Sequence, residues 1–163
     1  MRIIVAVSKS WGIGKDNKLL FSLKEDMKFF KQTTSGKVVV MGKNTYLSLP
    51  KRPLKDRINI VLTRECFDDG SITVKDMDEL FAQIKKYDTD NVYIIGGASM
   101  YKQMLPYCDT AFITKVDADS EADTYFTNLD ELSSWQCVQE SQAQDTLPIV
   151  FCTYKNNDVK EYK

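Results

Sequence analysis

Asp26 is the acidic side chain whose place in the sequence most strongly suggests chemistry. It lies in residues 22–31, where Leu23, Met27 and Phe30 recur at the spacing of one face of a helix. At about 100° per residue, Asp26 points within roughly 60° of the centre of that apolar stripe. A carboxyl group buried among apolar groups has a raised pKa and pairs with a polar ligand, as a binding site requires. The competing interpretation is an acid in water at the edge of the stripe, in the first helical turn, where the helix dipole favours it.

Glycine-containing turns that follow predicted strands suit phosphate groups. Residues 92–101 read as a strand, a glycine pair and a helix, and a helix N-terminus presents free N–H groups to an anion. Residues 40–45 form a similar turn that contains Lys43, and a third turn places Arg64 just after a strand. Neither the G-x-G-x-x-G nor the G-x-x-x-x-G-K-[ST] spacing is present. Together the turns and the two cations would suit a dinucleotide with an extra phosphate, whereas singly each cation reads as a solvated surface charge.

The chain contains no histidine, which narrows the available chemistry. Ser-His-Asp and Cys-His catalysis, HExxH zinc sites and imidazole proton shuttles are all excluded, so protons must come from carboxylates, Tyr, Lys, Cys or water. The cysteines are Cys66, Cys108, Cys137 and Cys152. Because no C-x-x-C pair occurs, the spacing argues against a zinc knuckle and favours reduced thiols, and no metal site is expected.

Length and charge exclude further classes of protein. A chain of 163 residues fits one domain. The chain has 22 Lys+Arg and 23 Asp+Glu, and this near-neutral charge argues against general electrostatic binding to nucleic acid or to a membrane surface. No run approaches the roughly 18–20 apolar residues of a membrane span, and the apolar N-terminal run is too short for a signal peptide. A cytoplasmic protein is expected.

Short β-branched runs alternate with helical patterns, and these elements must position the residues above. Strands are expected at residues 3–7, 37–41, 58–62, 91–95, 111–116, 135–141 and 149–154, and helices at about 23–34, 43–49, 77–87 and 99–105. The pattern predicts an α/β fold with a single domain over residues 1–155. Its central sheet is expected to be mixed and mostly parallel, with about eight strands, an antiparallel C-terminal edge and about four flanking helices. Ser22 and Glu25 match a capping box for the first helix, and the polar C-terminal tail, residues 156–163, is expected to fray.

Taken in order, the motifs resemble the dihydrofolate reductase family over nearly the whole chain. They are Gly12-Ile13-Gly14, Leu23-x-x-Asp26-x-x-x-Phe30-Lys31, residues 40–46, Arg52-Pro53-Leu54, Arg57, residues 94–101, Asp117-Ala118 and residues 123–126. The resemblance implies a dihydrofolate reductase-like fold, and an enzyme that reduces 7,8-dihydrofolate to 5,6,7,8-tetrahydrofolate with NADPH and so supplies one-carbon metabolism. It also implies antifolates such as trimethoprim or methotrexate as inhibitors. A monomer is expected, because no apolar stripe is left over once the sheet and helices are assigned.

The same resemblance assigns roles to individual residues. Asp26 would hydrogen-bond the pterin's ring nitrogen and amino group, and the predicted catalytic residues are Asp26, Thr114 and Tyr101. The predicted substrate-binding residues are Ile4, Val5, Leu19, Asp26, Met27, Phe30, Leu49, Leu54, Arg57 and Ile95. The predicted cofactor-binding residues are Ala6, Ile13, Gly14, Gly42, Lys43, Asn44, Thr45, Leu62, Thr63, Arg64, Gly96, Gly97, Ala98, Ser99, Met100 and Tyr101. Arg57 would pair with the α-carboxylate of the glutamate tail, and Lys43 with Arg64 would meet the adenosine 2′-phosphate.

The implied mechanism depends on close approach more than on an acid. Hydride would pass from nicotinamide C4 to pterin C6, and water admitted to the pocket would protonate N5 while Asp26 raises the pterin's proton affinity. Residues 10–20 would form the lid that closes the pocket. The chain departs from the family at Leu20-Phe21, where Pro-Trp is common, at Ala98-Ser99 and at Ala122. The change at Ala98-Ser99 predicts a heavier reliance on Lys43 and Arg64 for the 2′-phosphate.

Two other functions fit parts of this pattern. One is a different pteridine or pyrimidine reductase of the same fold, such as the reductase domain of riboflavin synthesis. Asp26 with Phe30 and Arg57 favours folate, because a phosphorylated ribityl substrate needs no pocket for a benzoyl ring. The other is a non-catalytic nucleotide-binding or interaction domain, whose expected sign would be loss of Asp26 or of the Gly96-Gly97 turn, and both are present.

Overall fold

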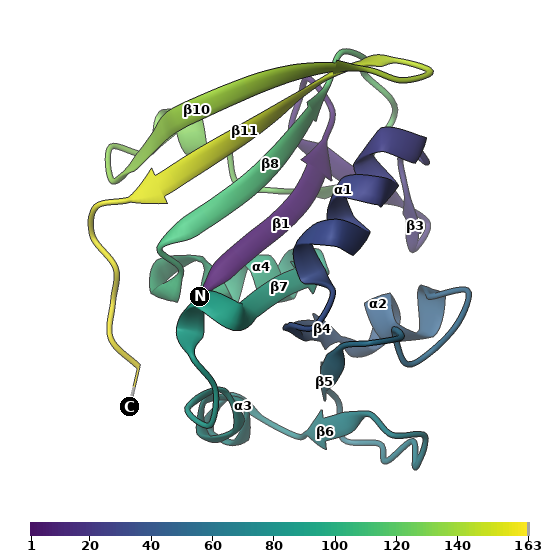
Figure 1. The fold of residues 1–163 in the computed structure, drawn as a ribbon, viewed down its shortest axis with the longest axis vertical. Coiled ribbons are helices and arrows are strands. Elements are labelled where there is room, and N and C mark those ends of the chain that lie inside the picture. Colours follow the sequence, from purple (N-terminus) through teal and green to yellow (C-terminus); the bar gives the residue numbers. More distant parts are fainter. Residues whose placement is uncertain (163) are drawn as a thin grey trace.

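The centre of the molecule is a mixed eight-stranded sheet. The computed structural model describes residues 1–162, and its main sheet runs in the order β10-β11-β8-β1-β7-β4-β5-β6 (Figure 1). The strands are β1 (Arg2–Val7), β4 (Val38–Gly42), β5 (Ile58–Leu62), β6 (Ile72–Val74), β7 (Val92–Gly96), β8 (Thr110–Val116), β10 (Trp135–Gln144) and β11 (Pro148–Asn156). Neighbours pair in parallel except for β8 with β11 and β10 with β11. The predicted fold class, with its antiparallel C-terminal edge, is confirmed.

Four α-helices accompany the sheet within the described residues. They are α1 (Lys24–Thr34), α2 (Lys43–Ser48), α3 (Met77–Ile84) and α4 (Ala98–Met104), with short 3-10 turns η1 (Thr89–Asn91), η2 (Leu105–Tyr107) and η3 (Leu129–Glu131). In Figure 1, α1 lies in front of the sheet and α4 lies behind it. None of the described helices is long and apolar enough to cross a membrane.

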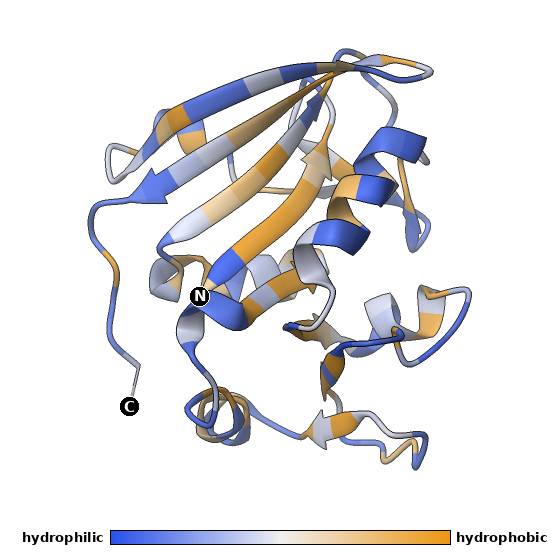
Figure 2. Ribbon diagram, viewed as in Figure 1, coloured by the Kyte–Doolittle hydropathy of each residue, from blue (hydrophilic) through white to orange (hydrophobic). Residues whose placement is uncertain are grey.

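Alternating side chains of β1 serve the two faces of the sheet. Ile3, Val5 and Val7 join the larger core together with Met100 and Met104 of α4. Because successive side chains of a strand point to opposite faces, the residues between them face α1. The strands at the centre of the sheet are hydrophobic over most of their length, while α1 alternates between hydrophobic and hydrophilic turns (Figure 2).

The face of α1 that packs on the sheet differs from the predicted stripe. Phe29 makes the aromatic contacts, with ring centroids 6.1 Å from Phe112 of β8 and 4.7 Å from Phe151 of β11. Leu23 is buried as predicted, but Met27 is 59% exposed. The prediction was wrong for Met27 because Phe29, two residues further along the helix, is the side chain that packs on the sheet.

The start of α1 is capped from a distant part of the chain. The capping box predicted at Ser22 and Glu25 does not form: the helix begins after Leu23, whose side chain makes no cap. Instead the backbone N–H of Glu25 donates to Oδ2 of Asp145, 2.6 Å away, in the turn between β10 and β11. A tertiary contact thus satisfies a free helical N–H that the local sequence was expected to satisfy.

A second, three-stranded sheet contains the predicted lid. Its order is β3 (Lys18–Leu19), β2 (Gly12–Lys15) and β9 (Thr124–Tyr125). The backbone N–H of Asp16 donates to Oδ2 of Asp123 at 2.9 Å, and the N–H of Asp123 donates to the carbonyl of Gly14 at 3.0 Å. Ser10 adds a hydrogen bond of 2.5 Å from its hydroxyl to Asp119. Residues 10–20 are therefore tied to the segment that precedes and includes β9.

The C-terminal tail is packed rather than frayed over its described part. The N–H of Asn157 donates to the carbonyl of Ser134 at 2.7 Å, and the N–H of Lys160 donates to the carbonyl of Pro106 at 2.9 Å. Tyr162 stacks on Phe81 of α3 with ring centroids 5.1 Å apart. The expected fraying was wrong because one aromatic residue in an otherwise polar tail finds an apolar partner.

Candidate active site

The candidate site lies where β1 and β7 separate. The two strands pair only through their first residues, ending at Ile3 opposite Ile94, whereas β1 stays paired with β8 along its length. Just beyond that point, the carbonyl oxygen of Ile4 accepts a hydrogen bond of 2.9 Å from the hydroxyl of Tyr101. Crevices between diverging parallel strands, at their carboxyl ends, are where α/β proteins commonly bind ligands.

The Asp26 carboxylate is held against the sheet beside this crevice. Burial raises the pKa of Asp26, a hydrogen bond with Thr114 acts in the opposite direction, and the negative charge of Asp145 raises it further. Thr114 is itself buried, on β8 next to β1. The structure favours a half-buried carboxylate that faces the sheet over an acid in water at the edge of the stripe.

Tyr101 of α4 approaches the same crevice from the other side of the sheet. It is buried, and burial followed by the negative charge of Asp26 raises the pKa of its phenol. Tyr101 therefore stays protonated and donates to Ile4. Asp26 lies near enough to Tyr101 for its charge to act on the phenol, and it hydrogen-bonds with Thr114.

An apolar wall continues from Asp26 toward a cation. Half-buried side chains from α1, the segment after α2 and β7 supply the predicted wall: Phe30, Leu49, Leu54 and Ile95. The guanidinium of Arg57 lies 5.9 Å from the centre of the Phe30 ring, and its Nη1 donates to the Thr34 hydroxyl at 3.1 Å. Among the described residues, Arg57 forms no ion pair with a carboxylate. An oriented, partly buried guanidinium of this kind suits an anionic group of a ligand.

The predicted site residues differ in how far the structure buries them. Val5, Ile13 and Met100 are buried and belong to the larger core. Leu19 of β3 is 83% exposed and, like Met27, presents its apolar side chain to solvent. The sequence pattern could not separate these cases, because apolar side chains of the core and of a ligand pocket look alike.

The two glycine turns predicted from the sequence meet in space. Thr45 of α2 lies so close to β7 that a Cβ built on Gly96 or on Gly97 would stand 3.2 Å from its Oγ1. Gly96 also has φ +140°, a conformation that side-chain-bearing residues rarely adopt. The beginnings of α2 and α4 are thus brought together, with the Thr45 side chain packed directly against the two glycines. The other predicted cofactor residues of these two turns are Gly42 and Asn44 in the first and Ala98 and Ser99 in the second. Leu62 is the last residue of β5, and Thr63 follows it.

One cation of the predicted phosphate site already has a partner. Nζ of Lys43 lies 2.6 Å from Oε1 of Glu65, and the two side chains are 42% and 54% exposed. Arg64 is exposed and forms no ion pair among the described residues. Sequence reasoning missed Glu65, although it follows Arg64 directly, because the pairing joins residues 22 positions apart.

Comparison with known proteins decides the family. The model of the dihydrofolate reductase family matches residues 1–156. The chain belongs to the dihydrofolate reductase family. It is 38% identical over 127 residues to the dihydrofolate reductase of Haemophilus influenzae, covering 78% of each chain, and 38% identical over 146 residues to that of Gallus gallus, covering 78% of this chain and 77% of the relative. A solved dihydrofolate reductase from Enterococcus faecalis, in complex with NADP(H) and RAB-propyl, superimposes with a TM-score of 0.86 at 30% identity and 96% coverage of both chains.

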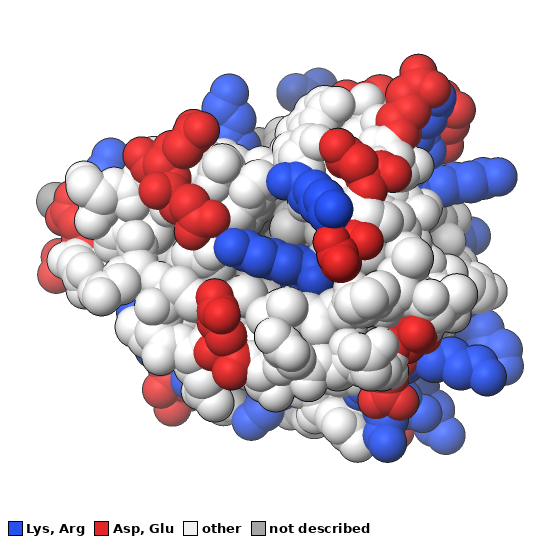
Figure 3. Space-filling model, turned by 90° about the horizontal axis from the view of Figure 1, so that it is seen from above, with Lys and Arg blue, Asp and Glu red and all other residues white. Residues whose placement is uncertain are grey.

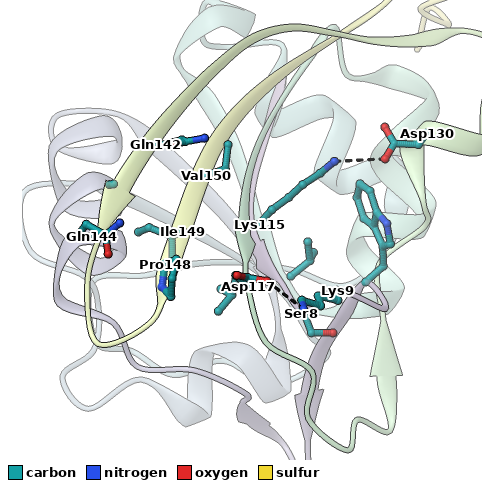
Figure 4. Close-up of a pocket in the computed structure, with 14 residues that line it drawn as sticks. Ser8, Lys9, Lys115, Asp117, Asp130, Gln142, Gln144, Pro148, Ile149 and Val150 are labelled. Carbon is teal, nitrogen blue, oxygen red and sulfur yellow. Dashed lines mark hydrogen bonds and ion pairs between the residues drawn. The ribbon is translucent and has the colours of Figure 1, made fainter.

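A separate cavity lies away from the candidate site described above. It has a volume of about 460 Å³ and is lined from β1, β8, β10 and β11, with Lys115 pointing across it to Asp130 at 3.2 Å (Figure 4). Its lining includes Lys115 and Val116, which point to opposite faces of β8, so the cavity lies at the carboxyl end of that strand rather than on one face of the sheet. Seen from above, this end of the molecule carries basic and acidic side chains next to one another around a hollow, rather than a field of one sign (Figure 3).

Proposed function

We propose that this protein reduces 7,8-dihydrofolate to 5,6,7,8-tetrahydrofolate with NADPH. The observation that carries the proposal is the half-buried Asp26 carboxylate, which hydrogen-bonds with Thr114 beside the point where β1 and β7 separate. Membership of the dihydrofolate reductase family supports the reaction, and the NADP(H) bound by the Enterococcus faecalis relative supports the cofactor. Because Asp26 would meet the pterin, antifolates such as trimethoprim or methotrexate are expected to compete with dihydrofolate.

The Asp26 carboxylate would hold the pterin by accepting hydrogen bonds from its ring N–H and amino group. Ionised Asp26 is costly in a buried site, as its raised pKa shows, so two donors from a ligand would stabilise it. The carbonyl of Ile4, already oriented by Tyr101, would accept a further hydrogen bond from the same amino group. These contacts would fix the pterin ring without transferring a proton.

The proton that pterin N5 gains would come from water. The chain has no histidine, and the Tyr101 hydroxyl is committed to Ile4 with a raised pKa, so neither supplies an acid of suitable strength. Asp26, as an anion near the ring, would raise the proton affinity of the pterin. The lid formed by residues 10–20 would then control when water reaches the ring.

The other end of the substrate would lie between the apolar wall and Arg57. Phe30, Leu49 and Leu54 would contact the benzoyl ring, and Arg57 would bind the α-carboxylate of the glutamate. The orientation of Arg57 by Thr34 and by the Phe30 ring favours folate over a phosphorylated ribityl substrate, which needs no apolar wall before its anion.

The residues present fit the cofactor. The tight contact of Gly96 and Gly97 with Thr45 places the N-terminus of α4 beside that of α2, where backbone N–H groups would bind a pyrophosphate, and Lys43 with Arg64 would bind a 2′-phosphate. When bound, NADPH supplies the hydride that reduces pterin C6. This chain's part is to hold the two rings in contact and exclude bulk water.

The test is the loss of nicotinamide absorbance when folded protein is mixed with NADPH and dihydrofolate. Turnover is expected for the native chain and for Asp78→Asn, a matched control that removes a carboxylate from the first turn of α3. Asp26→Asn is expected to lose most turnover at neutral pH while NADPH binding persists. No turnover by the folded native chain would overturn the proposed reaction, and full activity of Asp26→Asn would overturn the role of Asp26 alone.

A further inference from the structure

Two cysteines and a glutamate gather on the edge of the sheet that the proposed reaction does not use. Cys137 and Glu140 belong to β10, and Cys152 belongs to β11. One ligand atom from each, two Sγ and a carboxylate oxygen, lie within 4.8 Å of one another. Cys137 Sγ is 3.8 Å from Oε1 of Glu140.

A β-bulge creates this cluster. In a regular strand, residues 137 and 140 would face opposite sides, because side chains alternate with a period of two. The register of β10 on β11 shifts between Cys137 and Gln139, so that Cys137 lies opposite Tyr154 while Glu140 lies opposite Cys152. Since Tyr154 and Cys152 share a face of β11, the extra residue brings Cys137 and Glu140 to that same face.

The spacing of the three atoms matches a tetrahedral metal centre. With bonds of roughly 2.3 Å to sulfur and 2.1 Å to oxygen, tetrahedral Zn²⁺ sets its ligands about 3.6–3.8 Å apart. The observed 3.8 Å between Cys137 and Glu140 already agrees, and small rotations would bring Cys152 within range. Paired antiparallel strands hold all three backbones in place.

We propose that Cys137, Glu140 and Cys152 form a site for one divalent cation of the zinc class, which would crosslink β10 to β11. Two thiolates and one carboxylate are a donor set that favours zinc and cadmium over magnesium or calcium. Glu140 is exposed, which leaves access for the ion and room for a water molecule as the fourth ligand.

Charged and titratable groups around the cluster set the conditions for binding. Burial raises the pKa of Cys152 to about 12 and also raises that of Cys137, while the Lys115 ammonium lowers both. Because a thiolate and not a thiol binds the ion, metal binding would release the two thiol protons. The Lys115 ammonium is the neighbouring cation that would repel a metal ion. Its charge is balanced by the Asp130 carboxylate, 3.2 Å away.

The test uses the full chain, stripped with a chelator and kept in a phosphine reductant that does not offer thiols. Titration with Cd²⁺ is expected to produce the ultraviolet charge-transfer band of cadmium–thiolate bonds, saturating at one ion per chain. Zn²⁺ at about 100-fold excess over its Kd is expected to raise the Tm by about 5 °C or more.

Matched variants assign the signal to the cluster. Cys137→Ser is expected to abolish both effects, Glu140→Gln to weaken binding at least tenfold, and Cys66→Ser, which removes an exposed cysteine elsewhere, to leave both unchanged. If Cys137→Ser does not fold in the metal-free state, Glu140→Gln alone decides, because its side chain is exposed. Absence of the band in the native chain, a band unchanged in both cluster variants, or a band lost in Cys66→Ser would overturn the proposal.

Discussion

Glu65→Gln is expected to increase the affinity of this protein for NADPH. In the structure, the Glu65 carboxylate lies 2.6 Å from the Lys43 ammonium, the cation expected to bind the 2′-phosphate. An exposed ion pair contributes about 0.2–1 kcal/mol, which the phosphate must overcome when it displaces the carboxylate. The remaining carboxylate also repels the phosphate, by about 0.6 kcal/mol per pair of unit charges at roughly 7 Å in water. An effect of about 1 kcal/mol follows, or about fivefold in Kd.

The measurement is a fluorescence titration of NADPH at low and high ionic strength. Because salt screens exposed charges, the gain in Glu65→Gln should shrink at about 0.5 M salt. NADH, which has no 2′-phosphate, should respond little. Glu79→Gln is the matched control. It removes the same charge from an exposed ion pair at α3, in which Nζ of Lys75 lies 3.5 Å from Oε1 of Glu79.

Two results would refute the reasoning. An unchanged or weaker affinity for NADPH in Glu65→Gln would show that Glu65 does not compete with the phosphate. An equal gain for NADH would show that the substitution acts on some other part of the cofactor or on the fold.

Three further changes test the substrate end of the site. Arg57→Met is expected to raise the KM for dihydrofolate about 10- to 100-fold without changing NADPH affinity, since a charge-assisted pair contributes about 1.5–3 kcal/mol. An equal rise in KM for a substrate that lacks the glutamate tail would contradict this role. Asp145→Asn keeps an acceptor for the N–H of Glu25 but removes a negative charge that raises the pKa of Asp26. The titration midpoint of Asp26, followed by carboxyl ¹³C NMR, should therefore fall. An unchanged midpoint would argue against this coupling. Asp26→Asn should stabilise the ligand-free protein near pH 7, because burial raises the pKa of Asp26 and ionisation of the native side chain costs stability as the pH rises through that folded value. In urea unfolding, the increase in the free energy of unfolding should fade below about pH 4. An increase that does not depend on pH would contradict the reasoning.

The fold class could be predicted from the sequence because its signals are local. Continuous apolar runs such as residues 37–41 and 58–62 read as buried parallel strands wherever they lie in the chain, and the structure has strands at Val38–Gly42 and Ile58–Leu62. The absence of histidine and the order of the family motifs likewise need no coordinates. These features also indicated Asp26 and the glycine turns as candidate site residues.

Only the tertiary structure decided how those residues are used. Asp26 is half-buried and hydrogen-bonds with Thr114 of β8, and α1 is capped by Asp145 from a turn about 120 residues away in the chain. Lys43 is paired with Glu65, and a bulge in β10 brings Cys137 to Glu140. Each of these contacts joins segments that are far apart in the sequence, and the sequence alone does not indicate which distant segments lie close together in space. Side-chain spacing therefore determined which elements form, and packing determined which polar groups meet.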